Sequence, residues 1–290
     1  MILANDWKDY ELIDASRKEK YERWGNVYLL RPDPQVIWDH GDLREKYQGK
    51  MDAIYHRSSS GGGHWENLKE TPSSWKIQYE DLTFHIKQMG FKHTGLFPEQ
   101  AVNWKWMMKK IENSHREIRV LNLFGYTGGA TVACLKAGAH VTHVDSSKGM
   151  VDWCKENVSS SGLQGDHIRY LVDDVVKFVE REIRRGNHYD AIVMDPPSYG
   201  RGSKGEIWDI EKDLNYLVGL CTQILSEKPL FFLINSYTTG LSPMVLENLL
   251  KLFVKEKYHG EVSSGEIGIP IQNHELVLPC GIYGRWEENE

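Results

Sequence analysis

The chain has 290 residues, of which 40% are hydrophobic and 26% charged, so it is long enough to bury one large core or two modest ones. Its 35 lysines and arginines against 41 aspartates and glutamates give a net charge of −6, which excludes a protein whose whole surface binds polyanions. Any contact with a nucleic acid therefore requires a local patch of positive charge. The longest strongly apolar stretch, residues 229–234, is far shorter than the roughly 18 residues of a membrane span, and charged residues are frequent from the start of the chain. We expect neither a transmembrane helix nor a signal peptide.

The cysteines and histidines predict a reduced, cytoplasmic protein without a metal. The chain has four widely spaced cysteines: Cys134, Cys154, Cys221 and Cys280. They form no C-x-x-C pair and are too few for a disulfide scaffold or a cysteine-based zinc site. Histidines at positions 56, 64, 85 and 93 lack a metal-ligand spacing such as H-E-x-x-H.

Residues 1–92 are predicted to form a small β-rich domain, and residues 93–290 a second domain. Tryptophan, glycine and proline are frequent in the first region, and short runs with strand character lie at 27–30, 53–56, 75–79 and 82–86. Two roles fit this first domain: it recognises a substrate, or it is merely structural.

From about Pro98 onward, segments with helical periodicity alternate with apolar, β-branched segments, which is typical of an α/β fold with a mostly parallel sheet. We expect strands at 119–123, 140–144, 168–172, 191–194 and 230–234, and helices at 129–137, 148–160, 175–185, 210–225 and 244–256. Two further strands, 262–267 and 276–283, have no helix between them and are expected to form an antiparallel hairpin at the sheet edge. The prediction is a sheet of seven strands.

A glycine-rich turn follows the first of these strands: Phe124-Gly125-Tyr126-Thr127-Gly128-Gly129. Its glycines are interpreted as letting the backbone approach a ligand closely before the next helix begins. The spacing is not G-x-G-x-x-G, so a dinucleotide site is the weaker option. The alternative without a ligand is an ordinary entry into a helix.

Acidic residues follow the second and third strands. Asp145 lies about twenty residues beyond the glycine turn, where a carboxylate can accept both hydroxyls of a ribose. Asp173 and Asp174 follow the third strand, from which a carboxylate can accept the exocyclic amine of an adenine. Each acid alone could equally be a helix cap. Together with the turn they predict a site for S-adenosylmethionine, whose sulfonium cation suits acidic loops.

The fourth strand ends in Asp195-Pro196-Pro197-Ser198-Tyr199. The two prolines remove two backbone donors and predict a rigid, extended arch. Asp195 can accept a hydrogen bond or proton from a ring nitrogen or an amine, the Pro196 carbonyl can accept another, and Tyr199 offers a face on which a base can stack.

These motifs resemble class I S-adenosylmethionine-dependent methyltransferases, which have a Rossmann-like sheet. More narrowly, they are similar to the bacterial 23S rRNA large-subunit methyltransferases. The resemblance rests on NLFGYTG at 122–128, DSS at 145–147, DD at 173–174 and DPPSY at 195–199, and covers roughly residues 75 to 290. Residues 92–100 (KHTGLFPEQ) resemble the element that in this family precedes the catalytic domain and closes over the methionine end of the cofactor.

The resemblance implies roles for particular residues. The set that it places on the cofactor is Phe97, Gln100, Phe124, Gly125, Tyr126, Thr127, Gly128, Asp145, Ser146, Asp173, Asp174 and Asp195. Within that set, Asp145 would bind the ribose and Asp174 would face the adenine, with Asp173 as the fallback. It also implies four catalytic residues near the methyl group that is transferred: Asp195, Pro196, Pro197 and Tyr199.

One departure from the family concerns the reacting atom. Members that methylate C5 of cytosine carry a nucleophilic cysteine after the fifth strand, because carbon must be activated by a covalent adduct. Here that position is Asn235-Ser236-Tyr237-Thr238. We therefore predict direct methyl transfer to a nucleobase nitrogen, with ribosomal RNA as the expected substrate.

A local patch for RNA is predicted just after the arch. Arg201 and Lys204 lie in a loop at 200–205 that is expected to fold over the substrate, with Trp208 available for stacking. The alternative is a solvated surface loop that binds no substrate. Three competing functions stay open at this point: a protein or small-molecule N-methyltransferase, a non-catalytic assembly factor that binds the cofactor, and a nicotinamide-dependent oxidoreductase.

Overall fold

The structure is a computed structural model that describes residues 1–59, 61–163, 165–202 and 204–289. It divides into two compact units. The first unit contains residues 1–2, 102–267 and the chain from 281 onward, and the second contains residues 3–101 and 268–280.

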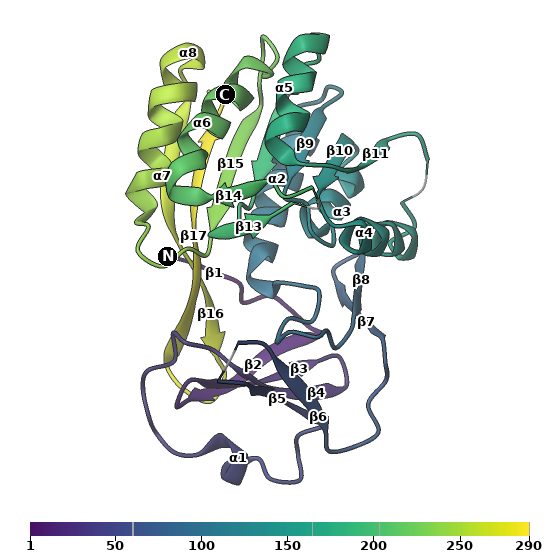
Figure 1. Ribbon diagram of the computed structural model, residues 1–290, viewed down its shortest axis with the longest axis vertical. Coiled ribbons are helices and arrows are strands. Elements are labelled where there is room, and N and C mark those ends of the chain that lie inside the picture. Colours follow the sequence, from purple (N-terminus) through teal and green to yellow (C-terminus); the bar gives the residue numbers. More distant parts are fainter. Residues whose placement is uncertain (60, 164, 203, 290) are drawn as a thin grey trace. The chain divides into compact units, whose positions relative to one another are not determined.

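The first unit is built on an eight-stranded sheet in the order β1-β16-β17-β15-β12-β9-β10-β11 (Figure 1). Its strands are β1 (Ile2–Leu3), β9 (Arg119–Leu123), β10 (His140–Asp145), β11 (Ile168–Val172), β12 (Ala191–Met194), β15 (Phe231–Ser236), β16 (Glu261–Ile271) and β17 (Leu276–Glu287). The central strands from β15 to β11 are parallel, and β17 is antiparallel to β15. The predicted seven strands are thus confirmed, and only the two-residue strand β1 is added at the edge.

Helices alternate with these strands: α2 (Ala101–Asn113), α3 (Gly129–Lys136), α4 (Lys148–Ser160), α5 (Val175–Arg185), α6 (Ile210–Gln223), α7 (Pro243–Leu250) and α8 (Glu256–Tyr258). A π-helical turn, Lys251–Lys255, joins the last two. All of the predicted helices are present, but α2 was not predicted. Its inward positions Trp104, Met107 and Ile111 are buried at the three- and four-residue spacing of an amphipathic helix.

The core of this unit follows from the alternation of side chains along each strand. On β9, Leu121 and Leu123 belong to a buried cluster with Phe178 of α5, Leu217 of α6 and Leu246 of α7. These three helices therefore cover one face of the sheet. The intervening residue Asn122 faces the opposite side, where its amide donates to the Thr131 hydroxyl of α3 at 2.9 Å.

The second unit is β-rich, as predicted for the N-terminal region. A five-stranded sheet contains, in order, β2 (Tyr10–Ser16), β3 (Glu19–Trp24), β4 (Val27–Pro32), β5 (Ala53–Arg57) and β6 (Gly63–Asn67). A separate hairpin pairs β7 (Trp75–Tyr79) with β8 (Leu82–Ile86), and two short helices are α1 (Leu43–Lys46) and the 3₁₀ helix Pro98–Gln100. The sheet encloses a buried ion pair in which Arg31 donates two hydrogen bonds to the Glu22 carboxylate, at 2.7 and 2.8 Å.

Within the described ranges, none of the helices is long and apolar enough to cross a membrane.

Candidate active site

The loops that carry the predicted motifs follow the carboxyl ends of parallel strands, which meet at one edge of the sheet. The turn after β9 has an unusual backbone. Phe124 and Tyr126 have positive φ values of 56° and 52°, and Gly128, the N-cap of α3, has φ 85°. Residues other than glycine seldom adopt this region, and such strain is concentrated at functional sites.

Two of the three glycines in this turn are required by contacts within the protein. A Cβ atom on Gly125 would collide with the imidazole of His143, and one on Gly128 would collide with the Cys154 thiol. Both side chains are buried parts of the protein. These glycines therefore allow the turn to lie close to strand β10 and helix α4, and close approach of the backbone to a ligand stays a prediction.

His143 lies beneath the turn and was not singled out in the sequence. Its Nδ1 is 2.8 Å from the Thr131 hydroxyl, which also accepts from Asn122. Burial lowers the pKa of His143 to about 4, so the ring is neutral at pH 7. The only sequence signal was a second histidine in the strand HVTHVD, next to Val144.

Asp145 links the turn after β9 to the loop after β10. Its Oδ2 accepts from the Tyr126 amide at 2.9 Å, and its Oδ1 accepts from the Ser147 amide at 2.8 Å. Burial raises the pKa of Asp145, and the two amide donors oppose that shift. A carboxylate has about four acceptor positions, so this one retains capacity for further donors. The neighbouring Ser146 is exposed.

The two acids after β11 have structural partners. Asp174 is the N-cap of α5, and its Oδ1 accepts from the Lys177 amide at 2.9 Å. Asp173 forms an ion pair with Arg181 and accepts from the Asp174 amide at 2.9 Å. The helix-cap alternative is therefore true of Asp174, and the cap uses its Oδ1.

The arch after β12 is held by neighbouring loops. Oδ1 of Asp195 accepts from Nδ2 of Asn235, at the end of β15, at 3.0 Å. The hydroxyls of Ser198 and Thr238 are 2.7 Å apart. Asn235 and Thr238 thus support the arch from β15 and the loop that follows it, and sequence analysis noted this segment only for its lack of cysteine.

The predicted role of Trp208 is wrong, whereas the stacking role of Tyr199 stays a prediction. Trp208 is buried, donates from Nε1 to the Pro197 carbonyl at 2.7 Å, and packs on Phe124 with ring centroids 5.0 Å apart. It stiffens the arch and has no face available for a base. Tyr199 is 55% exposed and can offer its ring to one.

Arg201 and Lys204 are exposed beside the arch. The segment predicted as a plain loop contains part of a two-stranded antiparallel hairpin, in which β13 (Tyr199–Arg201) pairs with β14 (Ile207–Asp209). Ser203, within that predicted loop, lies outside the described residues. Strand pairing fixes the backbone of Arg201 more firmly than a free loop would.

Other predicted residues are placed as follows. Thr127 is buried, and its carbonyl accepts a hydrogen bond from the side-chain amide of Asn157 at 2.8 Å. Phe97 and Gln100 belong to the second unit, at the start and end of the 3₁₀ helix.

All four cysteines are unsuited to nucleophilic catalysis. Cys134, Cys154 and Cys221 are buried, and Cys280 is partly buried. Burial raises the pKa of each thiol, to about 12 for Cys134, so the reactive thiolate is scarce at neutral pH.

The sheet order, with antiparallel β17 next to the fifth parallel strand, defines the Rossmann-like fold of class I methyltransferases. A family model for S-adenosylmethionine-dependent methyltransferases matches residues 18–247, and the chain belongs to this family. It is therefore a methyltransferase enzyme, and S-adenosylmethionine is its cofactor.

Two solved structures and two curated relatives illustrate the similarity. A methyltransferase from Agrobacterium tumefaciens superposes with a TM-score of 0.93 at 35% identity, over 100% of this chain and 94% of that one. SMU.776, a putative methyltransferase complexed with SAH, shares the fold with a TM-score of 0.71 at 17% identity, over 97% and 76%. Ribosomal RNA large subunit methyltransferase K of Neisseria meningitidis is 26% identical over 87% of this chain. The chain spans 66% of that relative and 25% of a methyltransferase K/L of Syntrophotalea carbinolica, which is 28% identical over 62% of this chain.

Proposed function

We propose that this enzyme methylates a nucleobase nitrogen of ribosomal RNA by direct transfer. The observation that carries the proposal is the arch after β12. There the Asp195 carboxylate is held at 3.0 Å by Asn235, close in sequence to the exposed ring of Tyr199, and the loop after β15 contains no cysteine. These are an acceptor for an N–H group and a face for a planar base.

The residues at the strand ends fit the cofactor. Asp145 retains acceptor capacity for ribose hydroxyls while its backbone partners fix its position. Asp174 offers Oδ2 to the adenine amine, and the turn 124–128, Ser146 and the segment with Phe97 and Gln100 complete the proposed set. When bound, S-adenosylmethionine supplies a methyl group on an electrophilic sulfonium.

The chain's own residues position the nucleophile. Asp195 accepts the hydrogen bond of an exocyclic or ring N–H and takes up the proton as nitrogen becomes methylated. The Pro196 carbonyl is a second acceptor, and Tyr199 stacks on the base. Pro196 and Pro197 limit the movement of the arch, to which Trp208 adds a hydrogen bond.

The lack of a cysteine at the family's nucleophile position supports methyl transfer to nitrogen rather than to carbon. Methylation at C5 of a pyrimidine needs a nucleophile that adds to the ring, and Asn235, Ser236, Tyr237 and Thr238 provide no thiol. A nitrogen lone pair attacks the methyl group without such an adduct, so a hydrogen-bond acceptor is sufficient.

The RNA substrate is supported by the names of the curated relatives and by the exposed cations Arg201 and Lys204. Both can contact phosphates beside the arch despite the acidic total charge. We also propose that the enzyme acts in the cytoplasm.

The test incubates the full chain with methyl-labelled S-adenosylmethionine and either ribosomal RNA from a strain lacking the gene or total protein. We expect label in the RNA fraction, loss of labelling with Asp195→Ala, and an N-methylated nucleoside by mass spectrometry. Label in protein or small molecules would identify the alternative substrate class, and a C-methylated nucleoside would contradict direct transfer to nitrogen. If no fraction is labelled and Asp195→Ala leaves a deletion phenotype complemented, the chain is an assembly factor.

A further inference from the structure

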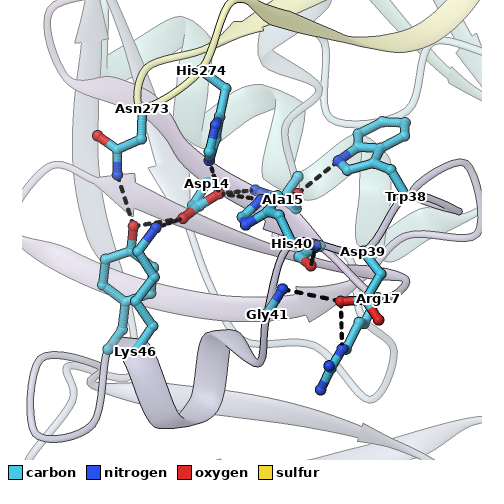
Figure 2. Close-up of polar contacts among 12 residues, drawn as sticks. Asp14, Ala15, Arg17, Trp38, Asp39, His40, Gly41, Lys46, Asn273 and His274 are labelled. Atoms are coloured by element: carbon cyan, nitrogen blue, oxygen red, sulfur yellow. Dashed lines mark hydrogen bonds and ion pairs between the residues drawn. The ribbon is translucent and has the colours of Figure 1, made fainter.

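A cluster of metal-ligating side chains lies in the second unit, apart from the proposed active site. Asp14 is on β2, His40 lies between β4 and α1, and His274 lies in the turn between β16 and β17 (Figure 2). The β2–β3 pairing shifts register between Leu12 and Asp14, and such bulges redirect side chains. Asp14 is fully buried, which is unusual for a carboxylate.

The spacing of the three ligand atoms suits a small divalent cation. Oδ1 of Asp14 is 3.0 Å from Nε2 of His40 and 3.2 Å from Nε2 of His274, and all three atoms lie within 4.8 Å of one another. Bonds of about 2.0–2.1 Å in a tetrahedral zinc site separate ligand atoms by roughly 3.3 Å. The two distances from Oδ1 of Asp14 differ from this value by a few tenths of an ångström, and the rings of His40 and His274, whose centroids are 4.2 Å apart, would have to separate to bind one ion.

The side chain of His274 gives a second, independent indication of a metal site. Its Nε2 is buried and has no hydrogen-bond partner within the described part of the chain, although Oδ1 of Asp14 is near. A buried polar atom without a partner costs free energy, and a metal ion would supply the missing partner.

The surroundings orient the Asp14 carboxylate. Its Oδ2, which is not one of the three ligand atoms, accepts a hydrogen bond from the Tyr47 hydroxyl at 2.7 Å and one from the Lys46 ammonium at 2.6 Å. The Tyr47 hydroxyl in turn accepts a hydrogen bond from the side-chain amide of Asn273 at 2.7 Å. Figure 2 shows Lys46 and His274 reaching Asp14 from different directions. Hydrogen bonds of this kind to the second oxygen are typical of carboxylates that bind a metal through the first.

His40 can give up its present contact without leaving another group unsatisfied. Its Nε2 lies 3.0 Å from the Ala15 carbonyl, which also accepts from Nε1 of Trp38 at 2.7 Å. Ala15 thus keeps a donor when Nε2 of His40 becomes a ligand.

The three segments are also held in place by the backbone. The amides of Gln272 and Asn273 donate to the carbonyls of Leu12 and Ile13, at 3.0 and 3.2 Å. The side chains of His40 and His274 are 25% and 30% exposed, so an ion can enter from solvent.

We propose that Asp14, His40 and His274 form a structural site for a divalent transition metal, with zinc as the preferred ion and water as the fourth ligand. Two imidazoles and one carboxylate are ligands that zinc favours. The ion would fasten the turn between β16 and β17 to β2. This site differs from the absence of metal predicted from sequence spacing, because its ligands come from three distant segments.

The test removes metal from the full chain with a chelator, adds zinc chloride, dialyses, and measures bound zinc by elemental analysis. We expect one equivalent in the unaltered chain, a loss of at least tenfold in occupancy with His274→Ala, and one equivalent with His56→Ala. His56 is a matched control because it also faces a carboxylate, Glu66 at 2.6 Å, and stacks on His64. Cobalt chloride should give the absorption bands of a tetrahedral ion in the chain and in the control.

A second variant keeps the proposal testable if His274→Ala unfolds the turn. His40→Ala removes a different ligand and leaves the Ala15 carbonyl bonded to Trp38, so zinc occupancy should also fall at least tenfold. Zinc should also raise the Tm of the unaltered chain by several degrees. An unaltered chain that binds no zinc, or zinc binding that His274→Ala and His40→Ala leave unchanged, would overturn the proposal.

Discussion

The side-chain amide of Asn235 donates to Oδ1 of Asp195 at 3.0 Å, which joins the end of β15 to the proline arch after β12. This hydrogen bond limits the orientations that the Asp195 carboxylate can adopt. Asn235 is thus a positioning residue for the proposed acceptor.

Replacing Asn235 tests this relationship. Asn235→Ala should lower kcat of RNA methylation by about 10- to 100-fold while binding of S-adenosylhomocysteine changes little, as expected for loss of orientation at the reacting group. Asn235→Asp places a second carboxylate beside Asp195, so one pKa of the pair rises and the pH profile of kcat shifts upward. The exposed Asn248→Ala of α7 is the control. Equal rates for Asn235→Ala and the unaltered enzyme would refute the positioning role.

Asp145 is expected to determine cofactor affinity. Asp145→Asn removes the negative charge and replaces one carboxylate oxygen by an NH₂ group. That group cannot accept a hydrogen bond, so one of the two backbone amides, of Tyr126 or Ser147, loses its acceptor. We expect the Kd for S-adenosylhomocysteine to rise about 10- to 100-fold, because charge-assisted hydrogen bonds are worth about 1.5–3 kcal/mol. Calorimetric titration measures this, with Asp152→Asn on the exposed surface of α4 as the control. The same Kd for Asp145→Asn and the unaltered chain would remove Asp145 from the site.

The two turn glycines should respond differently to a second substitution. Gly125→Ala collides with the buried His143 ring, at an expected cost of about 1–3 kcal/mol in the free energy of unfolding. Adding His143→Ala should recover much of this cost in a double-mutant cycle. Gly128→Ala also faces the positive φ of 85°, so relieving its collision by Cys154→Ala should recover only part.

Urea unfolding followed by circular dichroism measures these four variants and the two pairs. Gly149→Ala, where a Cβ meets only the Ser147 hydroxyl at 3.9 Å, is the control and should change stability by less than about 0.5 kcal/mol. Strict additivity of Gly125→Ala and His143→Ala would show that the ring does not restrict the turn.

The buried ion pair of the second unit should be sensitive to removal of one charge. Burial raises the pKa of Glu22, but attraction from Arg31 and Lys20 outweighs it and lowers that pKa to about 2. Glu22→Gln leaves the Arg31 guanidinium buried and unpaired in charge, with an expected loss of about 3–5 kcal/mol in the free energy of unfolding. Glu19→Gln, which breaks the more exposed pair with Arg44, should cost less than about 1 kcal/mol by the same urea measurement. Similar losses for the two variants would contradict this prediction.

His143 should make the protein less stable in mild acid. Its pKa in the folded chain is lowered to about 4, so between the ordinary value of 6.5 and pH 4 the unfolded chain binds the proton and the folded chain does not. The free energy of unfolding therefore falls as the pH decreases through that window, by up to about 1.4 kcal/mol per pH unit from this group. His93, whose pKa burial also lowers to about 4, adds to the slope.

The measurement compares Tm at closely spaced pH values for the unaltered chain and His143→Leu. The variant should show a flatter dependence between pH 6.5 and 4, and the further substitution His93→Leu should flatten it again. An unchanged slope in His143→Leu would mean that the ring is already accessible to protons in the folded state.

Local patterns predicted most elements of the first unit. Alternation of apolar β-branched runs with helical periodicity located five parallel strands and the helices after them, because each signal depends on residues close together in sequence. The same approach missed β2 and β3, whose polar and aromatic residues gain their burial from neighbouring strands, and β6, whose residues stay exposed or half-buried. It also missed α2, where Trp104 and Met107 form the buried stripe.

The sequence by itself determined the fold class, the family and the loops that carry the proposed site, since parallel strands bring their carboxyl ends to one edge whatever the details of packing. Only the tertiary structure decided what those residues contact. It assigned the space at Gly125 to His143, buried Trp208 under the arch, and paired Asn235 with Asp195. It also brought Asp14 and His274 together across most of the chain. Such contacts depend on the directions of side chains from distant segments, which sequence spacing does not encode.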